Sequence, residues 1–201
     1  MAQLYFYYGT MNSSKSAQLL MANHNYRDQG KNTIVFKPKR DTRDGPYVTS
    51  RAFEEQLPVI WIGEDEQGRM CATTREQMAE RDIHCVLVDE AQFLTPAQVD
   101  ELTDIVDELQ VPVLCYGLIT DFQTHFFAGS RRLMEIADKR SEIKTVCYYC
   151  TSKSLINMRI DEQGQAVTAG EQVKIGGNDT YRPVCRKCYK QRTTRSTRKQ
   201  Q

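Results

Sequence analysis

The chain has 201 residues, and its 27 Lys and Arg residues almost balance its 26 Asp and Glu residues. That balance gives no support to a general nucleic-acid-binding role, and no stretch approaches the roughly 18 apolar residues that a membrane span requires. The N-terminus lacks the basic and apolar segments of a secretory signal. We therefore expect a cytoplasmic protein whose seven cysteines are not structural disulfides.

Strands alternate with helices over the first two thirds of the chain. The predicted strands are 3–8, 33–36, 58–62, 85–88 and 111–116, and the predicted helices are 15–29, 73–81, 96–109 and 129–138. Turn-forming residues place 40–50 in a loop. Alternation of this kind indicates an α/β fold, with a parallel sheet flanked by helices on both faces. We assign residues 1–143 to this domain.

A phosphate-loop motif joins the first predicted strand to the first predicted helix. The pattern is Gly, four residues, Gly, Lys, then Ser or Thr, and residues 9–16 match it at Gly9, Lys15 and Ser16 but carry Ser14 in place of the second glycine. A loop that enters a helix N-terminus points N–H groups at an anion. Lys15 would reach the β- and γ-phosphates and Ser16 would ligate Mg²⁺. The alternative is a polar turn with a solvated lysine.

An acidic pair, Asp89 and Glu90, directly follows the apolar run 85–88. In phosphate-loop enzymes an aspartate at this place holds Mg²⁺, and a neighbouring glutamate can take a proton from an attacking hydroxyl or position a water molecule. The structural alternatives are a strand-end cap for Asp89 and a surface carboxylate for Glu90.

Two C-x2-C pairs, separated by 34 residues, predict a structural zinc site. Four thiolates complete a tetrahedral, closed coordination shell. The ligands are Cys147, Cys150, Cys185 and Cys188. Strands 155–160 and 165–175, with a turn at 161–164, are predicted to form a hairpin between the pairs. We assign 144–191 to a zinc-binding domain.

The last ten residues, 192–201, contain basic residues and no acidic ones. We expect a solvated, disordered tail, and the alternative is a binding arm.

Taken together, these motifs resemble the type II thymidine kinase family over roughly residues 2–190. The resemblance rests on Met11-Asn12 within the phosphate loop, Asp41-Thr42-Arg43, Asp89-Glu90-Ala91-Gln92-Phe93, Asp121-Phe122-Gln123, and Ile175-Gly176-Gly177-Asn178 through Tyr181 to Cys185. It implies a RecA-like phosphate-loop domain with a small C-terminal zinc-binding lasso domain.

The resemblance also implies an activity, which is transfer of the ATP γ-phosphate to the 5′-hydroxyl of thymidine or deoxyuridine in nucleotide salvage. Glu90 would be the general base, and Ser16 and Asp89 would hold Mg²⁺. The implied ATP-binding residues are Gly9, Thr10, Met11, Asn12, Ser13, Ser14, Lys15, Ser16, Asp41, Arg43, Asp89 and Gln92. The implied thymidine-binding residues are Met11, Phe93, Leu118, Phe122, Phe127, Val173, Ile175, Gly176 and Tyr181.

Two further implications concern the lasso and the assembly. The lasso, at about residues 172–181, would hang from the zinc site and hold the base largely through main-chain atoms. Family members are often homotetramers, and no nucleic-acid or membrane partner is expected. The rival functions are a zinc-containing phosphate-loop ATPase that acts on nucleic acid, and a non-catalytic member disabled by Ser14.

Overall fold

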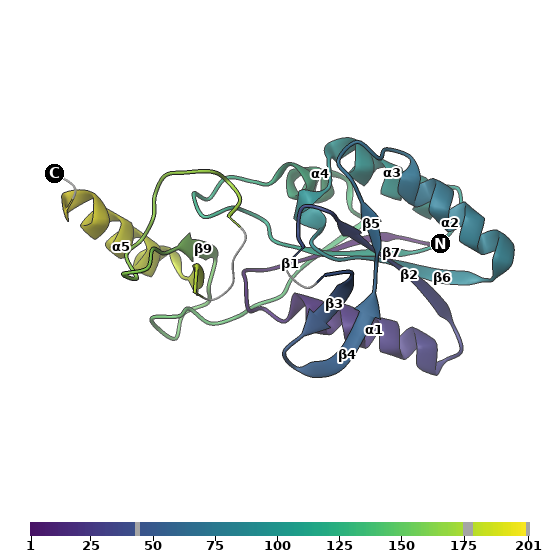
Figure 1. The fold of residues 1–201 in the computed structure, drawn as a ribbon, viewed down its shortest axis with the longest axis horizontal. Coiled ribbons are helices and arrows are strands. Elements are labelled where there is room, and N and C mark those ends of the chain that lie inside the picture. The colour runs from purple at the N-terminus through teal and green to yellow at the C-terminus, as the bar shows by residue number, and fades with distance from the viewer. Residues whose placement is uncertain (43–44, 175–178, 200–201) are drawn as a thin grey trace.

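A six-stranded parallel sheet forms the centre of the protein in this computed structural model, which describes residues 1–42, 45–174 and 179–199 (Figure 1). The strand order is β5-β2-β6-β7-β1-β8, and every pairing is parallel. The strands are β1 (Leu4–Tyr8), β2 (Asn32–Pro38), β5 (Ile60–Ile62), β6 (Ile83–Val88), β7 (Val113–Gly117) and β8 (Lys139–Glu142). The predicted α/β fold is therefore confirmed.

Helices cover both faces of this sheet. On one face lies α1 (Lys15–Asp28), with the hairpin of β3 (Tyr47–Ser50) and β4 (Phe53–Pro58) beside it. On the other face lie α2 (Arg69–Glu80), α3 (Pro96–Asp107) and α4 (Ala128–Ile136). Residues 85–88 of β6 enter the two apolar cores in turn, which explains why this run is apolar.

Local signals set the start of α3 at Pro96, where the sequence predicts it, whereas α2 begins at Arg69, before the predicted start at residue 73. The hydroxyl of Thr95 accepts from the Gln98 N–H at 3.2 Å, the Gln98 side chain accepts from the Thr95 N–H at 3.0 Å, and Pro96 occupies the first turn of α3. This capping box satisfies two N–H groups that the helix itself leaves unpaired. Thr95 is therefore the N-cap of α3.

The C-terminal module differs from the predicted hairpin. Strand β9 (Ile156–Arg159) pairs antiparallel with β10 (Tyr181–Val184), and a single bridge joins Ile160 to Ala166. Residues 165–174 form no strand, and residue 175 lies outside the described part. The physical reason is that the Arg159 side chain donates hydrogen bonds to the carbonyl oxygens of Glu171 and Gln172. These oxygens are therefore not available to accept hydrogen bonds from a neighbouring strand.

Three other segments also differ from the sequence-based expectation. Residues 47–58 form the β3–β4 hairpin, where the sequence predicts a loop at 40–50, and β8 is an additional strand. Helix α5 (Arg186–Lys199) continues through most of the segment for which composition predicts a disordered tail. It gains a tertiary contact there, because the Arg192 guanidinium lies 3.2 Å from the centroid of the Tyr149 ring. Among the described residues, no helix has the length and apolarity to cross a bilayer.

Parallel pairing brings three functional segments to one edge of the sheet. The phosphate loop follows β1, the acidic pair follows β6, and Leu118 follows β7, and these strands are neighbours or next neighbours in the order β6-β7-β1. Ligands of open α/β sheets bind at the carboxyl ends of the strands. The C-terminal module lies at this same end of the sheet (Figure 1).

We expect Gly129→Ala to lower the free energy of unfolding by about 2–3 kcal/mol, because overpacking a fixed site has that cost. A methyl group there would come within 2.5 Å of the Leu94 carbonyl oxygen and 2.8 Å of the Ala91 carbonyl oxygen, both of which are backbone atoms. Urea denaturation monitored by circular dichroism measures the change.

The matched control for this change is Gly63→Ala. The atoms nearest to its methyl group, at 3.0–3.4 Å, would belong to the side chains of Asp65 and Glu66, which yield more easily than backbone, so the expected cost is about 1 kcal/mol or less. Equal costs for the two variants would contradict the close approach of α4 to the segment 91–94.

Candidate active site

A pocket of about 580 Å³ opens at the carboxyl ends of the central strands. Most of the residues predicted to bind nucleotide or nucleoside line it: Met11, Asn12, Ser14, Lys15, Ser16, Asp41, Glu90, Gln92, Phe93, Leu118, Phe122, Phe127, Val173 and Tyr181. Gly9, Thr10, Ser13 and Asp89 are buried and do not line it. Arg43, Ile175 and Gly176 lie outside the described residues. The structure thus gathers segments far apart in the sequence around one cavity.

The phosphate loop leaves β1 at Gly9, whose N–H donates to the Gly117 carbonyl oxygen at 3.2 Å. A side chain at Gly9 would collide with the Ile143 carbonyl oxygen, 2.5 Å from an added methyl group, so only glycine fits there. The Lys15 ammonium folds back over the loop and donates to the Thr10 carbonyl oxygen at 2.8 Å. The loop therefore presents a cation over a cradle of backbone atoms, the arrangement that binds phosphate.

Two residues of the loop have left-handed backbone conformations, Asn12 at φ 60° and Ser14 at φ 63°. Asparagine adopts this region more readily than other non-glycine residues. Serine lacks that advantage, and the motif's usual glycine would carry no such cost. The substitution at position 14 therefore keeps the loop geometry but introduces local strain.

The C-terminal module is bonded directly to this loop. The Thr10 and Ser154 hydroxyl oxygens lie 2.7 Å apart, and the Met11 N–H donates to the Asn157 side-chain oxygen at 2.7 Å. Ser154 and Asn157 are almost fully buried. Sequence reasoning missed both residues, because a polar side chain just before or within a short strand gives no sign of the loop that it will meet.

Asp89 lies at the end of β6, buried beneath the pocket. Burial raises the pKa of its carboxyl group, the negative charge of Glu90 raises it further, and the positive charge of Lys37 opposes both effects. Asp41 adds a third carboxylate to this group. Such a cluster favours a bound divalent cation, because carboxylate oxygens are the ligands that Mg²⁺ prefers. The buried Lys37 was not among the predicted residues.

Glu90 is held at the rim of the pocket in a left-handed conformation, with φ 50° and ψ 40°. The Gln92 amide donates to the Glu90 carboxylate at 2.5 Å, and its oxygen accepts from the Leu118 N–H at 3.0 Å. Gln92 is only 2% exposed. Both ends of its amide are thus engaged by the protein, and it links the glutamate to the end of β7.

Aromatic side chains form one wall of the pocket, called the aromatic wall below: Phe93, Phe122, Phe127 and Tyr181. The Phe93 and Phe127 rings meet edge to face, with their centroids 5.7 Å apart. Phe122 is buried, and the Arg159 guanidinium lies 3.8 Å from its ring centroid. Tyr181 reaches the pocket from β10. An apolar slot beside a cationic loop suits a ligand with a flat ring at one end and a phosphate acceptor at the other.

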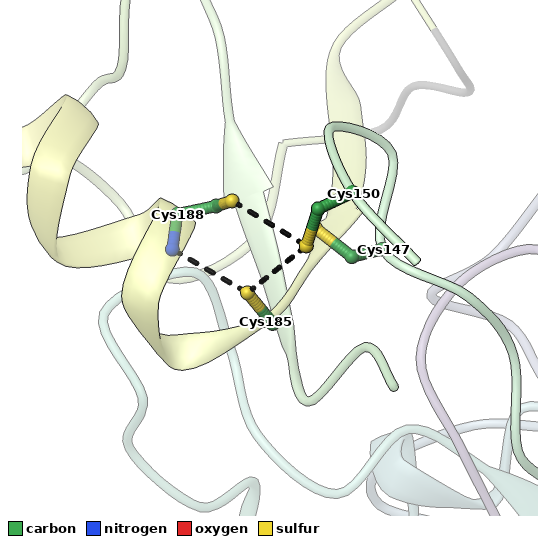
Figure 2. Close-up of side chains that lie close together, drawn as sticks. All are labelled: Cys147, Cys150, Cys185 and Cys188. Carbon is green, nitrogen blue, oxygen red and sulfur yellow. Dashed lines mark hydrogen bonds between the residues drawn. The ribbon is translucent and has the colours of Figure 1, made fainter. Parts of the chain in front are cut away.

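The four predicted zinc ligands meet in one cluster, Cys147 and Cys150 from a loop and Cys185 and Cys188 from the start of α5 (Figure 2). All four sulfur atoms lie within 4.8 Å of one another, and the Cys150 sulfur is 3.7 Å from that of Cys185 and 3.8 Å from that of Cys188. Tetrahedral zinc–thiolate bonds of about 2.3 Å require sulfur atoms about 3.8 Å apart, so the cluster fits zinc.

Backbone amides support this cluster as they do in metal-bound thiolates. The Tyr149 N–H donates to the Cys147 sulfur at 3.5 Å, and the Cys188 N–H donates to the Cys185 sulfur at 3.4 Å. Hydrogen bonds from Ser152 lower the pKa of the Cys150 thiol to about 6. Donors of this kind orient the ligands and stabilise their charged form.

Comparison with known proteins agrees with this arrangement. A family model described as "Thymidine kinase" matches residues 2–189. Proteins named thymidine kinase from Haemophilus influenzae, Rhodopirellula baltica and Streptococcus pyogenes are each 46% identical to the chain. The alignments cover 96%, 95% and 94% of this chain and 98%, 89% and 97% of those proteins, respectively.

We expect Ser14→Gly to raise the free energy of unfolding by about 0.5–1 kcal/mol, since a left-handed residue with a side chain costs about 1–2 kcal/mol and the greater chain entropy of glycine offsets part of that gain. Thermal and urea denaturation of the ligand-free protein measure the difference. Asn12→Gly is the control, and its gain should be smaller because asparagine tolerates this conformation. A Ser14→Gly variant no more stable than Asn12→Gly would contradict the strain.

Proposed function

The chain belongs to the thymidine kinase family, and on that premise we propose that it transfers the γ-phosphate of ATP to the 5′-hydroxyl of thymidine or deoxyuridine, giving the 5′-monophosphate in nucleotide salvage. One observation carries the proposal: Glu90 lines the same pocket as the phosphate loop and the aromatic side chains of Phe93, Phe122 and Phe127. A carboxylate there can reach a hydroxyl that faces the phosphate chain of a bound nucleotide.

The phosphate loop and the acidic cluster form the ATP half of the site. Lys15 would leave the Thr10 carbonyl oxygen, to which it now donates, and neutralise charge on the transferred phosphoryl group. Ser16 and Asp89 supply the oxygen ligands for Mg²⁺, which when bound offsets charge on the β- and γ-phosphates. The positive charge of that cation would offset the negative charges of the buried carboxylates beside Lys37.

Glu90 is the general base in this proposal, and Gln92 positions it. The sequence-based expectation places Gln92 among the ATP-binding residues. Its contacts support a different role, because its amide holds the Glu90 carboxylate at 2.5 Å and is itself held by the Leu118 N–H. A base fixed in this way needs no rearrangement before it takes the proton from the 5′-hydroxyl.

The aromatic wall forms the nucleoside half of the site. The Phe93–Phe127 pair and Phe122 offer flat apolar surface for a pyrimidine ring. Val173 and Tyr181, at the two ends of the proposed lasso, close the pocket from the C-terminal module. Exclusion of water by this cover would protect ATP from hydrolysis.

The cysteine cluster is proposed to bind zinc that is structural, because four thiolates leave no coordination position for substrate. Its role would be to order β9, β10 and the start of α5, since this module buries only a small core of its own. The homotetramer and the cytoplasmic location stay predictions.

With ATP and Mg²⁺, we expect the purified protein to convert thymidine and deoxyuridine into their 5′-monophosphates, and to leave purine nucleosides unchanged. Liquid chromatography of a nucleoside panel measures the products. The same assay with single-stranded DNA in place of nucleoside tests the rival ATPase. Hydrolysis of ATP that depends on DNA, without nucleoside phosphorylation, would overturn the proposal.

Variants of the base and of its partner extend this test. Glu90→Gln should lower kcat by about 10²–10⁴-fold, the usual contribution of a general base, while ATP binding measured by calorimetry persists. Gln92→Ala should lower kcat with little change in KM for ATP. If Gln92→Ala instead raises KM for ATP at unchanged kcat, Gln92 belongs to the ATP-binding set.

Protein purified without chelator should contain about one zinc ion per chain, as a closed four-thiolate site requires. Cys185→Ser should lose that zinc and lower thermal stability, whereas Cys71→Ser, which changes a thiol outside the cluster, should retain it. Plasma mass spectrometry measures the metal. Less than half an equivalent in the wild-type protein, or full zinc in Cys185→Ser, would contradict the assignment.

A further inference from the structure

Arg159, the last residue of β9, is a buried cation that neither the motifs nor the proposed chemistry uses. Its side chain is in the interior of the C-terminal module, and the residue is only 5% exposed. Burying a charged side chain is unfavourable unless its donors are satisfied. The partners of this guanidinium therefore indicate what its burial achieves.

Those partners lie on two separate segments of the chain. Nη1 donates to the Glu171 carbonyl oxygen at 2.9 Å, and Nη2 donates to the Gln172 carbonyl oxygen at 3.3 Å. Nε and Nη2 also donate to the Tyr181 hydroxyl oxygen, at 3.2 and 2.8 Å. One side chain thus bonds residues that are ten positions apart in the sequence.

The Tyr181 hydroxyl extends this connection. It donates to the Lys174 carbonyl oxygen at 3.0 Å and accepts from the Lys174 N–H at 3.3 Å. Lys174, Val173 and Gln172 all line the pocket, as does Tyr181. Arg159 therefore holds this pocket-lining segment at one end and the tyrosine at the other.

The flat face of the same guanidinium rests on the aromatic wall. Its central carbon lies 3.8 Å from the centroid of the Phe122 ring and 5.4 Å from that of the Tyr181 ring. A guanidinium over an aromatic face is favourable, and its planar donors can still bond in the plane. The carbonyl oxygens, the hydroxyl and the Phe122 ring are thereby fixed relative to one another.

We infer that Arg159 is a positioning residue for the nucleoside, which holds residues 171–174 and Tyr181 against Phe122 so that the nucleoside half of the pocket is formed before substrate arrives. It acts through these neighbours rather than on the reacting atoms. The inference rests on the proposed function for the identity of the ligand, and the geometry of the contacts stands independently of it.

Lysine cannot replace arginine in this arrangement. A lysine ammonium keeps the charge but lacks the planar fork that serves two carbonyl oxygens and a hydroxyl at once, and it does not stack on a ring in the same way. Arg159→Lys should therefore raise KM for thymidine about tenfold or more, while KM for ATP changes less than twofold. A role in folding alone would lower the active fraction, and hence kcat, with KM unchanged.

The chain offers a matched control in Arg182, on the neighbouring strand β10. Its guanidinium lies 4.5 Å from the centroid of the Tyr148 ring and donates to the Tyr149 hydroxyl at 2.7 Å, so it makes the same kinds of contact. Arg182 does not line the pocket. Arg182→Lys should leave both KM values unchanged, and an equal rise of the thymidine KM in both variants would overturn the specific role of Arg159.

A second readout needs no enzyme activity. Hydrogen–deuterium exchange of the peptide that contains the Lys174 amide should accelerate in Arg159→Lys and in Tyr181→Phe, because each removes part of the support for the bond from that amide to the Tyr181 hydroxyl. Peptides of β1 and α1 should keep wild-type exchange. Unchanged exchange at Lys174 in either variant would overturn the inference.

The two readouts separate this inference from the proposed function. If the wild-type protein phosphorylates no nucleoside but exchange at Lys174 accelerates, the proposed function fails and the structural part of the inference stands. If the wild-type protein phosphorylates thymidine and Arg159→Lys has a wild-type KM, the inference alone fails. Should Arg159→Lys not fold, Tyr181→Phe supplies the exchange measurement.

Discussion

The site depends on two hydrogen bonds that cross from the C-terminal module to the phosphate loop. They join the Thr10 hydroxyl to that of Ser154 and the Met11 amide to the Asn157 side chain. They connect the loop that binds phosphate directly to the β9 segment, beside the contacts that Arg159 and Tyr189 make with Phe122. The Thr10–Ser154 bond is buried and the Met11–Asn157 bond is partly buried, and away from water a hydrogen bond is stronger and an unmatched polar group costs more. The two halves of the pocket therefore form as one unit.

Burial at this site also constrains where charged side chains lie. The sheet edge gathers Asp89, Glu90 and Asp41 around the buried Lys37, and the C-terminal module buries Arg159. A charged side chain is unfavourable to bury by itself, and these side chains are tolerated because a neighbour or a ligand offsets the charge. Natural proteins accept such local costs mainly at functional sites. The positive φ angles of Ser14 and Glu90 belong to the same pattern.

Much of this organisation was predictable from sequence, because it rests on local or strictly periodic signals. The phosphate loop, the acidic pair after β6, the α3 capping box and the paired cysteines depend on residue type at fixed spacing. Non-local contacts were not predictable. The β9–β10 pairing competes with a plausible hairpin, and only the bonds from Arg159 to two carbonyl oxygens decide between them. The roles of Asn157 and Gln92 likewise depend on atoms far away in the sequence.

Helix α5 gives the C-terminal segment a structural role that its composition does not indicate. Its first turn carries Cys188 of the cluster, and Tyr189, one residue later, donates its hydroxyl to the Phe122 carbonyl oxygen at 2.9 Å. The helix is therefore fastened to the wall of the pocket as well as to the cysteine cluster. Truncating the protein just after Cys188 would keep every cysteine ligand yet remove a support of the pocket, although most of the deleted segment, residues 192–201, looks in the sequence like a dispensable basic tail.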